Sequence, residues 1–198
     1  MRMIKLPLLA AIFLSVSAVA DDAAAAQASP RVTIKTTKGE IVVELYPDKA
    51  PKTVANFLQY TRDGHYDGTI FHRVIGHFMI QGGGFEPGFY QGKFQPKATR
   101  APIELESRNG LRNDVGWIAM ARTNVPDSAT SQFFINTVDN DGLNHPSPDG
   151  HGYAVFGKVV SGMEVVGAIA GVPTGTVGPF RDVPTEAVLI ESVREVKP

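Results

Sequence analysis

The sequence predicts a mainly β fold, a closed or nearly closed antiparallel barrel of eight strands capped by two α-helices. Many short β-rich segments are separated by turn residues, whereas only two segments have the three- and four-residue apolar spacing of a helix. The chain has 198 residues and shows no internal repeat or second composition block. Its length therefore fits one domain with a substantial core.

The predicted strands begin with a hairpin. Two β-rich segments, 31–36 and 40–45, flank a turn at Thr37-Lys38-Gly39. Six further strand patterns follow at 69–74, 78–82, 117–121, 132–136, 153–159 and 187–193. The connections 82–116 and 139–152 are long, so we expect them to form a rim and not part of the core.

The first predicted helix begins at Pro51, where the missing N–H of proline does no harm, and ends at Asp63-Gly64. One apolar face should be buried, because apolar side chains recur at helical spacing. Its members are Val54, Phe57, Leu58 and Thr61.

The second predicted helix begins at Ser161, where Ser161 and Glu164 have the spacing of a capping box. Gly171 stands where a C-terminal glycine cap belongs. The residues expected on its buried side are Met163, Val166 and Ile169.

The N-terminal segment has the pattern of an export signal. Basic Arg2 and Lys5 precede an apolar run over 6–19, and Ala18-Val19-Ala20 matches a cleavage site. The run is shorter than the roughly 20 residues a spanning helix needs, although an uncleaved signal anchor is the alternative. We therefore expect a signal peptide at 1–20, a flexible leader at 21–30 and one domain at 31–198. This organisation predicts the periplasm, or otherwise the outside of the cell, without stable membrane association after cleavage.

Charge and cysteine content exclude several classes of function. The formal net charge is −1 and no basic patch appears, so nucleic acid is not an expected partner. The chain has no cysteine, which excludes disulfides, thiol catalysis and lipid attachment through a thiol. We expect a monomer that needs no cofactor and no metal.

Two neighbouring strand patterns place polar and apolar side chains together. Side chains alternate across a strand, so Met79 and Gln81 should share one face while Ile80 takes the other. By the same alternation Phe71 and Arg73 should share a face in the preceding strand. Met79, Gln81 and Arg73 are thus expected on the outside of the barrel.

The segment 132–136 adds a second amide beside an aromatic ring. Gln132 and Phe134 should point outward, opposite Phe133 and Ile135, and Phe78 can form the floor of the same hollow. An apolar hollow rimmed by hydrogen-bond donors is a binding site by default. The expected hollow has no nucleophile and no metal cage, which suits a reaction that makes and breaks no covalent bond.

Other interpretations of single residues favour structure over function. A lone arginine on a strand is typically solvated, strand glutamines typically bond across strands, and paired phenylalanines are typically core. His72 and His77 are interpreted as structural histidines, and Gly82-Gly83-Gly84 as a tight turn without the lysine of a phosphate loop.

Hydrolase and metal chemistry find little support. Ser128 and Ser131 do not lie in a G-x-S-x-G elbow. His145, Asp149 and His151 match no metal-ligand template, so a rim loop is the preferred interpretation.

The joint pattern Phe-His-Arg-Val-Ile-x-x-Phe-Met-Ile-Gln-Gly-Gly, followed by Ser-Gln-Phe-Phe-Ile, is far more specific than any single residue. With it, the chain resembles the cyclophilin family of peptidyl-prolyl cis-trans isomerases, most closely the bacterial exported branch. The resemblance extends over about 31–196 and includes segments 50–57, 120–123 and 152–159. It implies an eight-stranded cyclophilin barrel that isomerises X-Pro bonds and assists folding of exported proteins. The implied partners are unfolded or partly folded proline-containing polypeptides.

The resemblance also implies roles for individual residues. Arg73 resembles the catalytic arginine, and Gln81 the amide that holds the substrate carbonyl region. The resemblance assigns the walls of the proline pocket to Phe78, Met79, Phe134 and Leu143. It assigns a second polar contact to Gln132 and the segment beside the substrate backbone to Ala121, Arg122 and Thr123. Tyr153 is the last of these substrate-binding positions.

Several positions depart from the family pattern. Arg122 and Thr123 replace the commoner asparagine and alanine, and Tyr153 stands where histidine is frequent. Gly142 occupies the position of a loop tryptophan, so weak binding of ciclosporin is expected. The alternative function is a non-catalytic chaperone or proline-peptide-binding module on the same barrel.

Overall fold

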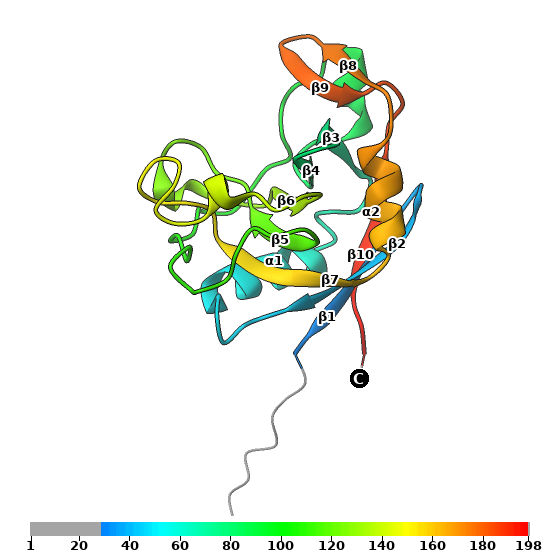
Figure 1. Ribbon diagram of the computed structural model, residues 1–198. Coiled ribbons are helices and arrows are strands. Elements are labelled where there is room, and N and C mark those ends of the chain that lie inside the picture. The colour runs from blue at the N-terminus through cyan, green and yellow to red at the C-terminus, as the bar shows by residue number, and fades with distance from the viewer. Residues whose placement is uncertain (1–28, 198) are drawn as a thin grey trace, which may run out of the picture.

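The structure, a computed structural model, describes residues 29–197 (Figure 1). The predicted signal peptide at 1–20 and most of the predicted leader at 21–30 lie outside the described residues. Pro30, the last residue of the predicted leader, accepts a backbone hydrogen bond of 2.8 Å from Leu45. The barrel therefore engages the chain one residue earlier than predicted.

Eight strands form the barrel, and all eight predicted strands are among them, with ends that differ by at most two residues. They are β1 (Arg31–Thr36), β2 (Gly39–Leu45), β3 (Thr69–Ile75), β4 (Met79–Gly82), β5 (Trp117–Met120), β6 (Phe133–Asn136), β7 (Val155–Ser161) and β10 (Leu189–Glu195). They close in the order β1-β10-β3-β4-β6-β5-β7-β2, with every pair antiparallel. The predicted fold class is confirmed.

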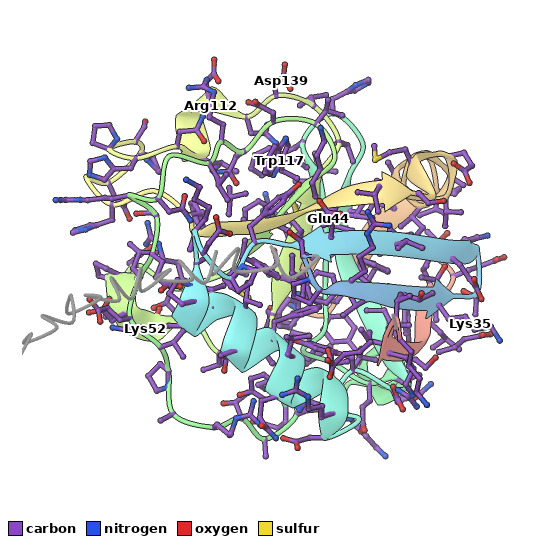
Figure 2. All side chains as sticks on the ribbon, turned by 90° about the horizontal axis from the view of Figure 1, so that it is seen from below. Lys35, Glu44, Lys52, Arg112, Trp117 and Asp139 are labelled. Atoms are coloured by element: carbon purple, nitrogen blue, oxygen red, sulfur yellow. The ribbon has the colours of Figure 1, made fainter. Side chains whose placement is uncertain are left out.

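Alternation along the strands separates a filled interior from a charged exterior. Ile80, Phe133 and Ile135 lie in the interior cluster, as predicted. On the outer face Lys35 of β1 and Glu44 of β2 stand among other charged side chains (Figure 2). The barrel therefore buries one side of each strand pattern and leaves the other side available for surface or site.

Helix α1 (Pro51–Arg62) has the predicted start, end and buried face. Its N-cap, Ala50, has no side chain that could bond the free N–H groups of the first turn. Glu106 supplies the acceptors instead: its carboxylate accepts from the backbone of Lys52 at 3.1 Å and of Thr53 at 2.8 Å. The long connection after β4 thus caps a helix distant in sequence.

Helix α2 (Met163–Ala170) corrects two predictions. Ser161 belongs to β7, and the N-cap is Gly162, which has a left-handed φ of 88° and makes no side-chain cap bond. The predicted capping box is therefore wrong, because Gly162, between strand and helix, takes a conformation that other residues avoid. Met163 is exposed and Val165 is buried in its place, whereas Val166, Ile169 and the C-cap Gly171 stand as predicted.

Both helices pack their apolar faces against the barrel interior, α1 with Val54 and Phe57 and α2 with Val166 and Ile169. Among residues 29–197, neither helix has the length and apolar character needed to cross a membrane.

An unpredicted two-stranded hairpin lies outside the barrel beside β3 (Figure 1). Its strands are β8 (Thr174–Val177) and β9 (Phe180–Pro184). Strand β8 is mostly exposed, so its sequence lacks the apolar alternation that predicts a strand.

The hairpin is supported by a second cluster outside the barrel, in which Phe85, Phe89, Ile70 and Val183 are buried. Phe89 belongs to a 3₁₀ turn, η1 (Pro87–Gln91). The beginning of the connection 82–116 is therefore core, and the prediction that all of it forms a rim is wrong. Two further 3₁₀ turns are η2 (Pro126–Ser128) and η3 (Asp141–Leu143).

Candidate active site

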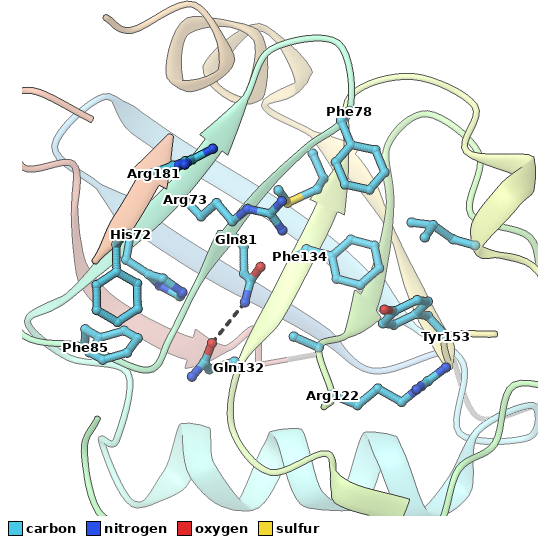
Figure 3. Close-up of a pocket in the computed structure, with 14 residues that line it drawn as sticks. His72, Arg73, Phe78, Gln81, Phe85, Arg122, Gln132, Phe134, Tyr153 and Arg181 are labelled. Carbon is cyan, nitrogen blue, oxygen red and sulfur yellow. Dashed lines mark hydrogen bonds between the residues drawn. The ribbon is translucent and has the colours of Figure 1, made fainter. Parts of the chain in front are cut away.

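A cleft of about 370 Å³ lies on the outer face of β3, β4 and β6, between the barrel and the β8–β9 hairpin (Figure 3). All the site residues named from the sequence line it except Thr123. The structure therefore brings together side chains that are up to 80 positions apart in the chain, from Arg73 to Tyr153. Four further lining residues, His72, Phe85, Phe180 and Arg181, were not predicted.

One end of the cleft is an apolar slot. Met79 of β4 and Phe134 of β6 form its buried base, because the two strands pair and both side chains point outward. Phe78, Leu143 and Tyr153 are partly buried around them. The rings of Phe134 and Tyr153 meet edge to face at a centroid distance of 5.6 Å. This slot has the composition expected to hold a small apolar ring.

The middle of the cleft is polar. Arg73 of β3 is the cross-strand partner of Gln81 of β4, and the Gln81 side-chain amide donates to the Gln132 side-chain carbonyl at 3.0 Å. Gly84 leaves room for this arrangement, since a Cβ there would lie 2.5 Å from the Gln132 side chain. Figure 3 shows Arg73 and Gln81 beside Phe78 and Phe134. Donor groups are thus fixed next to the slot.

The orientation of Arg73 depends on a β-bulge in β3. Phe71 pairs with Gly82 and Arg73 with Gln81, so His72 is an extra residue without a partner of its own. Phe71 consequently lies in the barrel interior while Arg73 borders the cleft. The prediction that Phe71 and Arg73 share a face is wrong, because the extra residue reverses the alternation between them.

The same bulge brings His72 to the cleft. The side chain is only 4% exposed and its ring lies 4.7 Å from that of Phe85. Its Nδ1 has no hydrogen-bond partner among the described residues. Burial lowers the pKa of His72 to about 4, with a smaller contribution from the neighbouring Arg73 guanidinium. His72 is therefore neutral at physiological pH.

Arg122 contacts its own loop extensively. Its side chain is 1% exposed and its guanidinium donates to both carboxylate oxygens of Asp149, at 2.9 and 2.7 Å. It also bonds the Gly152 carbonyl at 2.9 Å and lies over the Tyr153 ring at 4.6 Å. The bond from Arg122 is the largest cause of a lowered Asp149 pKa. Arg122 therefore ties the 149–153 segment to the cleft wall.

The neighbouring positions contribute less. Ala121 lines the cleft, whereas the hydroxyl of Thr123 bonds that of Ser128 at 2.8 Å and lies outside the lining. At Gly142, in η3, no atom lies within 4 Å of a Cβ position. The wall thus ends at Leu143.

The hairpin closes the other end of the cleft with Phe180 and Arg181, while the neighbouring Asp182 lies 4.0 Å from the Arg73 Nε. A sequence signal for these residues was absent, because the hairpin lies far from both motifs and its strands do not alternate.

The cleft suits binding and polarisation of a ligand more than covalent chemistry. Its described lining contains no serine, threonine, aspartate or glutamate that could act as nucleophile or carboxylate base. Within residues 29–197, no cluster of three histidine or carboxylate side chains could hold a metal ion. What remains is an apolar slot beside a guanidinium and two amides.

Comparison with known proteins agrees with this arrangement. Residues 31–195 match the family model described as cyclophilin type peptidyl-prolyl cis-trans isomerase. Peptidyl-prolyl cis-trans isomerase cyp18 of Streptomyces antibioticus is 59% identical over 165 residues, which cover 82% of this chain and 96% of that protein. Peptidyl-prolyl cis-trans isomerase B of Escherichia coli is 58% identical over 164 residues, with 82% and 97% covered.

A solved structure gives the same result for the fold. The crystal structure of a Cryptosporidium parvum cyclophilin type isomerase, determined in the presence of the dipeptide Ala-Pro, matches with a TM-score of 0.71 at 28% identity. The match covers 85% of this chain and 99% of that one.

Proposed function

We propose that this chain, which belongs to the cyclophilin family of peptidyl-prolyl cis-trans isomerases, acts on exported proteins while they fold, with Arg73 as its catalytic residue. The chain is a peptidyl-prolyl cis-trans isomerase and acts on proline-containing peptides. Its compartment, its clients and the roles of its residues are our inference.

The reaction is a rotation about one bond. The X-Pro amide resists rotation because its nitrogen shares a lone pair with the carbonyl, which gives a barrier of roughly 18–20 kcal/mol. Uncatalysed exchange therefore takes tens to hundreds of seconds. Halfway through the rotation this sharing is lost, and the nitrogen lone pair becomes a hydrogen-bond acceptor.

In our mechanism the Arg73 guanidinium donates to this nitrogen while the proline ring is held by Phe78, Met79 and Phe134. The observation that carries it is one cleft in which this guanidinium borders that apolar slot (Figure 3). The new hydrogen bond exists only in the twisted state, so it lowers the barrier without merely tightening substrate binding.

The remaining polar groups orient the peptide. Gln81 is proposed to hold the substrate carbonyl region, and its bond to Gln132 fixes the direction of its amide. Ala121 lies beside the path of the substrate backbone. Arg122 supports this path from behind, since its guanidinium is occupied by Asp149.

Replacement of Arg73 tests the mechanism. We expect Arg73→Ala to lower kcat/KM in a proline-limited peptide assay by about 100- to 1,000-fold, the range for loss of one transition-state donor. Arg73 is half exposed and lies outside the barrel interior, so circular dichroism and the unfolding midpoint should stay close to those of the parent protein.

Two variants sharpen this experiment. Arg73→Lys keeps the charge but loses the planar fork, so its rate should remain well below that of the parent protein. Arg108→Ala removes an exposed arginine that does not line the cleft and should have the parent rate. Near-parental turnover of Arg73→Ala would contradict the assignment.

A chaperone or peptide-binding module without turnover is the competing function. It predicts equal affinity for peptides in the parent protein and in Arg73→Ala, with no acceleration by either. The coupled peptide assay therefore separates the two functions.

The proposed compartment rests on the sequence of residues 1–20, with its basic start, apolar run and Ala18-Val19-Ala20 site. We expect the periplasmic fraction to hold a monomer that begins at Asp21. Mass analysis of its N-terminus checks this, and a cell-associated chain that retains Met1 would contradict export with cleavage.

A further inference from the structure

The β8–β9 hairpin brings to the cleft a cation for which the proposed mechanism has no use. Arg181 of β9 is exposed and lines the cleft near Arg73 (Figure 3). No hydrogen bond or ion pair to another described residue involves its guanidinium. An arginine that is neither paired nor part of the fold is available to a ligand.

The charges around the cleft are unbalanced at this end. Three arginines line the cleft and no carboxylate does. Arg122 is bonded to Asp149, and Arg73 has Asp182 at 4.0 Å, so each of these two has a counter-charge nearby. Arg181 alone has none within ion-pair distance among the described residues. The hairpin end should therefore attract negative charge.

Aromatic packing and a hydrogen bond anchor the hairpin next to the cleft. The Phe180 ring packs at 4.8 Å from the Phe89 ring and at 5.4 Å from the Phe94 ring. The hydroxyl of Tyr90 donates to the Pro184 carbonyl at 3.0 Å. These contacts hold the backbone that carries Arg181 beside the cleft.

A second β-bulge explains the direction of Arg181. Gly175 pairs with Val183 and Val177 with Phe180, so Arg181 and Asp182 together oppose a single residue of β8. Asp182 has a φ of 59°, the only positive value for a non-glycine residue within 29–197. Both neighbouring side chains therefore lie on the side of the cleft: Arg181 lines it, and Asp182 lies beside Arg73.

We propose that Arg181 forms a subsite that selects polypeptides with an acidic side chain close to the isomerised proline. The inference rests on the proposed function of the cleft, since it assumes that the proline ring occupies the slot at Phe134. Residues flanking that proline then extend toward the hairpin, where a guanidinium can bind a carboxylate through two parallel hydrogen bonds. A lysine at the same position of the peptide is repelled.

The test compares peptides that each contain one Ala-Pro bond and a single Glu, Gln or Lys at successive positions on either side of it. The value of kcat/KM for each peptide is divided by that for the Gln peptide with the same enzyme. For the parent protein we expect a Glu-over-Lys preference of about fivefold at one position, as for an exposed ion pair and its like-charge counterpart. This preference should shrink as the salt concentration rises.

Variants assign the preference to the hairpin. Arg181→Gln should abolish it and Arg181→Glu should invert it, whereas Arg108→Glu, an exposed arginine outside the cleft lining, should retain it. The same Glu-to-Lys ratio in all enzymes, or a ratio near one at every position in the parent protein, would overturn the subsite.

The outcome is separable from that of the proposed function. Turnover of the neutral peptide by the parent protein and its loss in Arg73→Ala decide the mechanism. If no peptide is turned over, NMR titration can still measure the affinities of the Glu and Lys peptides. These affinities decide whether Arg181 favours an acidic over a basic side chain.

Discussion

The inner and outer faces of β4 and β6 should respond differently to substitution, although alternating residues of the same strands form them. On the inner face Ile80, Phe133 and Ile135 are fully buried in a close-packed core. On the outer face Gln81 and Phe134 border an open cleft. Stability and catalysis are thus assigned to opposite sides of one sheet, so neighbouring substitutions should affect different properties.

The largest expected contrast is between Phe133 and Phe134. Phe133→Ala should lower the free energy of unfolding by about 3–5 kcal/mol, because it leaves a closed cavity in the barrel. Phe134→Ala should lower it by less, because Phe134 is also buried but the space that it leaves joins the cleft and not the closed barrel interior. Its kcat/KM should nevertheless fall by tenfold or more, since the proline ring loses one wall of its slot.

Urea unfolding of the purified variants measures the loss of stability. The peptide assay, with its rate divided by the concentration of folded protein, measures the loss of kcat/KM. If Phe133→Ala does not accumulate, Phe133→Leu provides the same ordering with a smaller loss. Equal stability losses at the two positions, or an unaffected rate in Phe134→Ala, would contradict the separation of the two faces.

A smaller effect concerns pH and is confined to the outer face. His72 is the one fully buried histidine among residues 29–197, and its folded pKa of about 4 lies below the ordinary 6.5. In the window between these two values the unfolded chain binds a proton that the folded chain does not, so stability rises with pH. The free energy of unfolding should therefore be lower by roughly 3 kcal/mol at pH 4 than at pH 7.

His72→Gln should remove most of this pH dependence in urea titrations. His65 provides the matched control: burial also lowers its pKa, but the residue is only partly buried, so His65→Gln should remove less. The lowered pKa values of Asp67 and Asp149 also make stability fall as the pH falls, but mainly below their ordinary value of 3.8, so they contribute only at the acid end of the window. An unchanged slope in His72→Gln would refute this origin of the pH dependence.

The sequence was sufficient for the barrel because its strands alternate regularly. The inward direction of Ile80 and Phe133 and the outward direction of Gln81 and Phe134 followed from a period of two residues. Helical spacing of three and four residues likewise predicted the buried residues of α1. These features depend on local pattern alone, and they were predicted correctly.

The errors occur where the backbone departs from that pattern. An extra residue at His72 reversed the face of Phe71, and a left-handed Gly162 moved the start of α2. Alternation cannot reveal a bulge, because the extra residue has no special composition. It becomes visible only through the pairing of Arg73 with Gln81 across two strands.

Part of the site was also beyond sequence reasoning because tertiary contacts create it. Phe180 and Arg181 reach the cleft through a hairpin that is held by aromatic rings from the 85–94 segment. Arg122 was identified as a cleft residue, but its burial under Asp149 and Tyr153 could not be inferred from spacing. The predicted roles of the site residues remain predictions that the experiments above address.

The irregular pairing between Phe71 and Arg73 has a consequence for protein engineering. Anyone grafting this cleft onto a designed barrel must copy the number of residues between the two positions, and not only the arginine and glutamine. A scaffold strand with uniform hydrogen bonding would turn the transplanted guanidinium toward the solvent-free centre of the barrel. The first criterion for choosing such a scaffold is therefore a strand pair in which one strand carries one extra residue at this point.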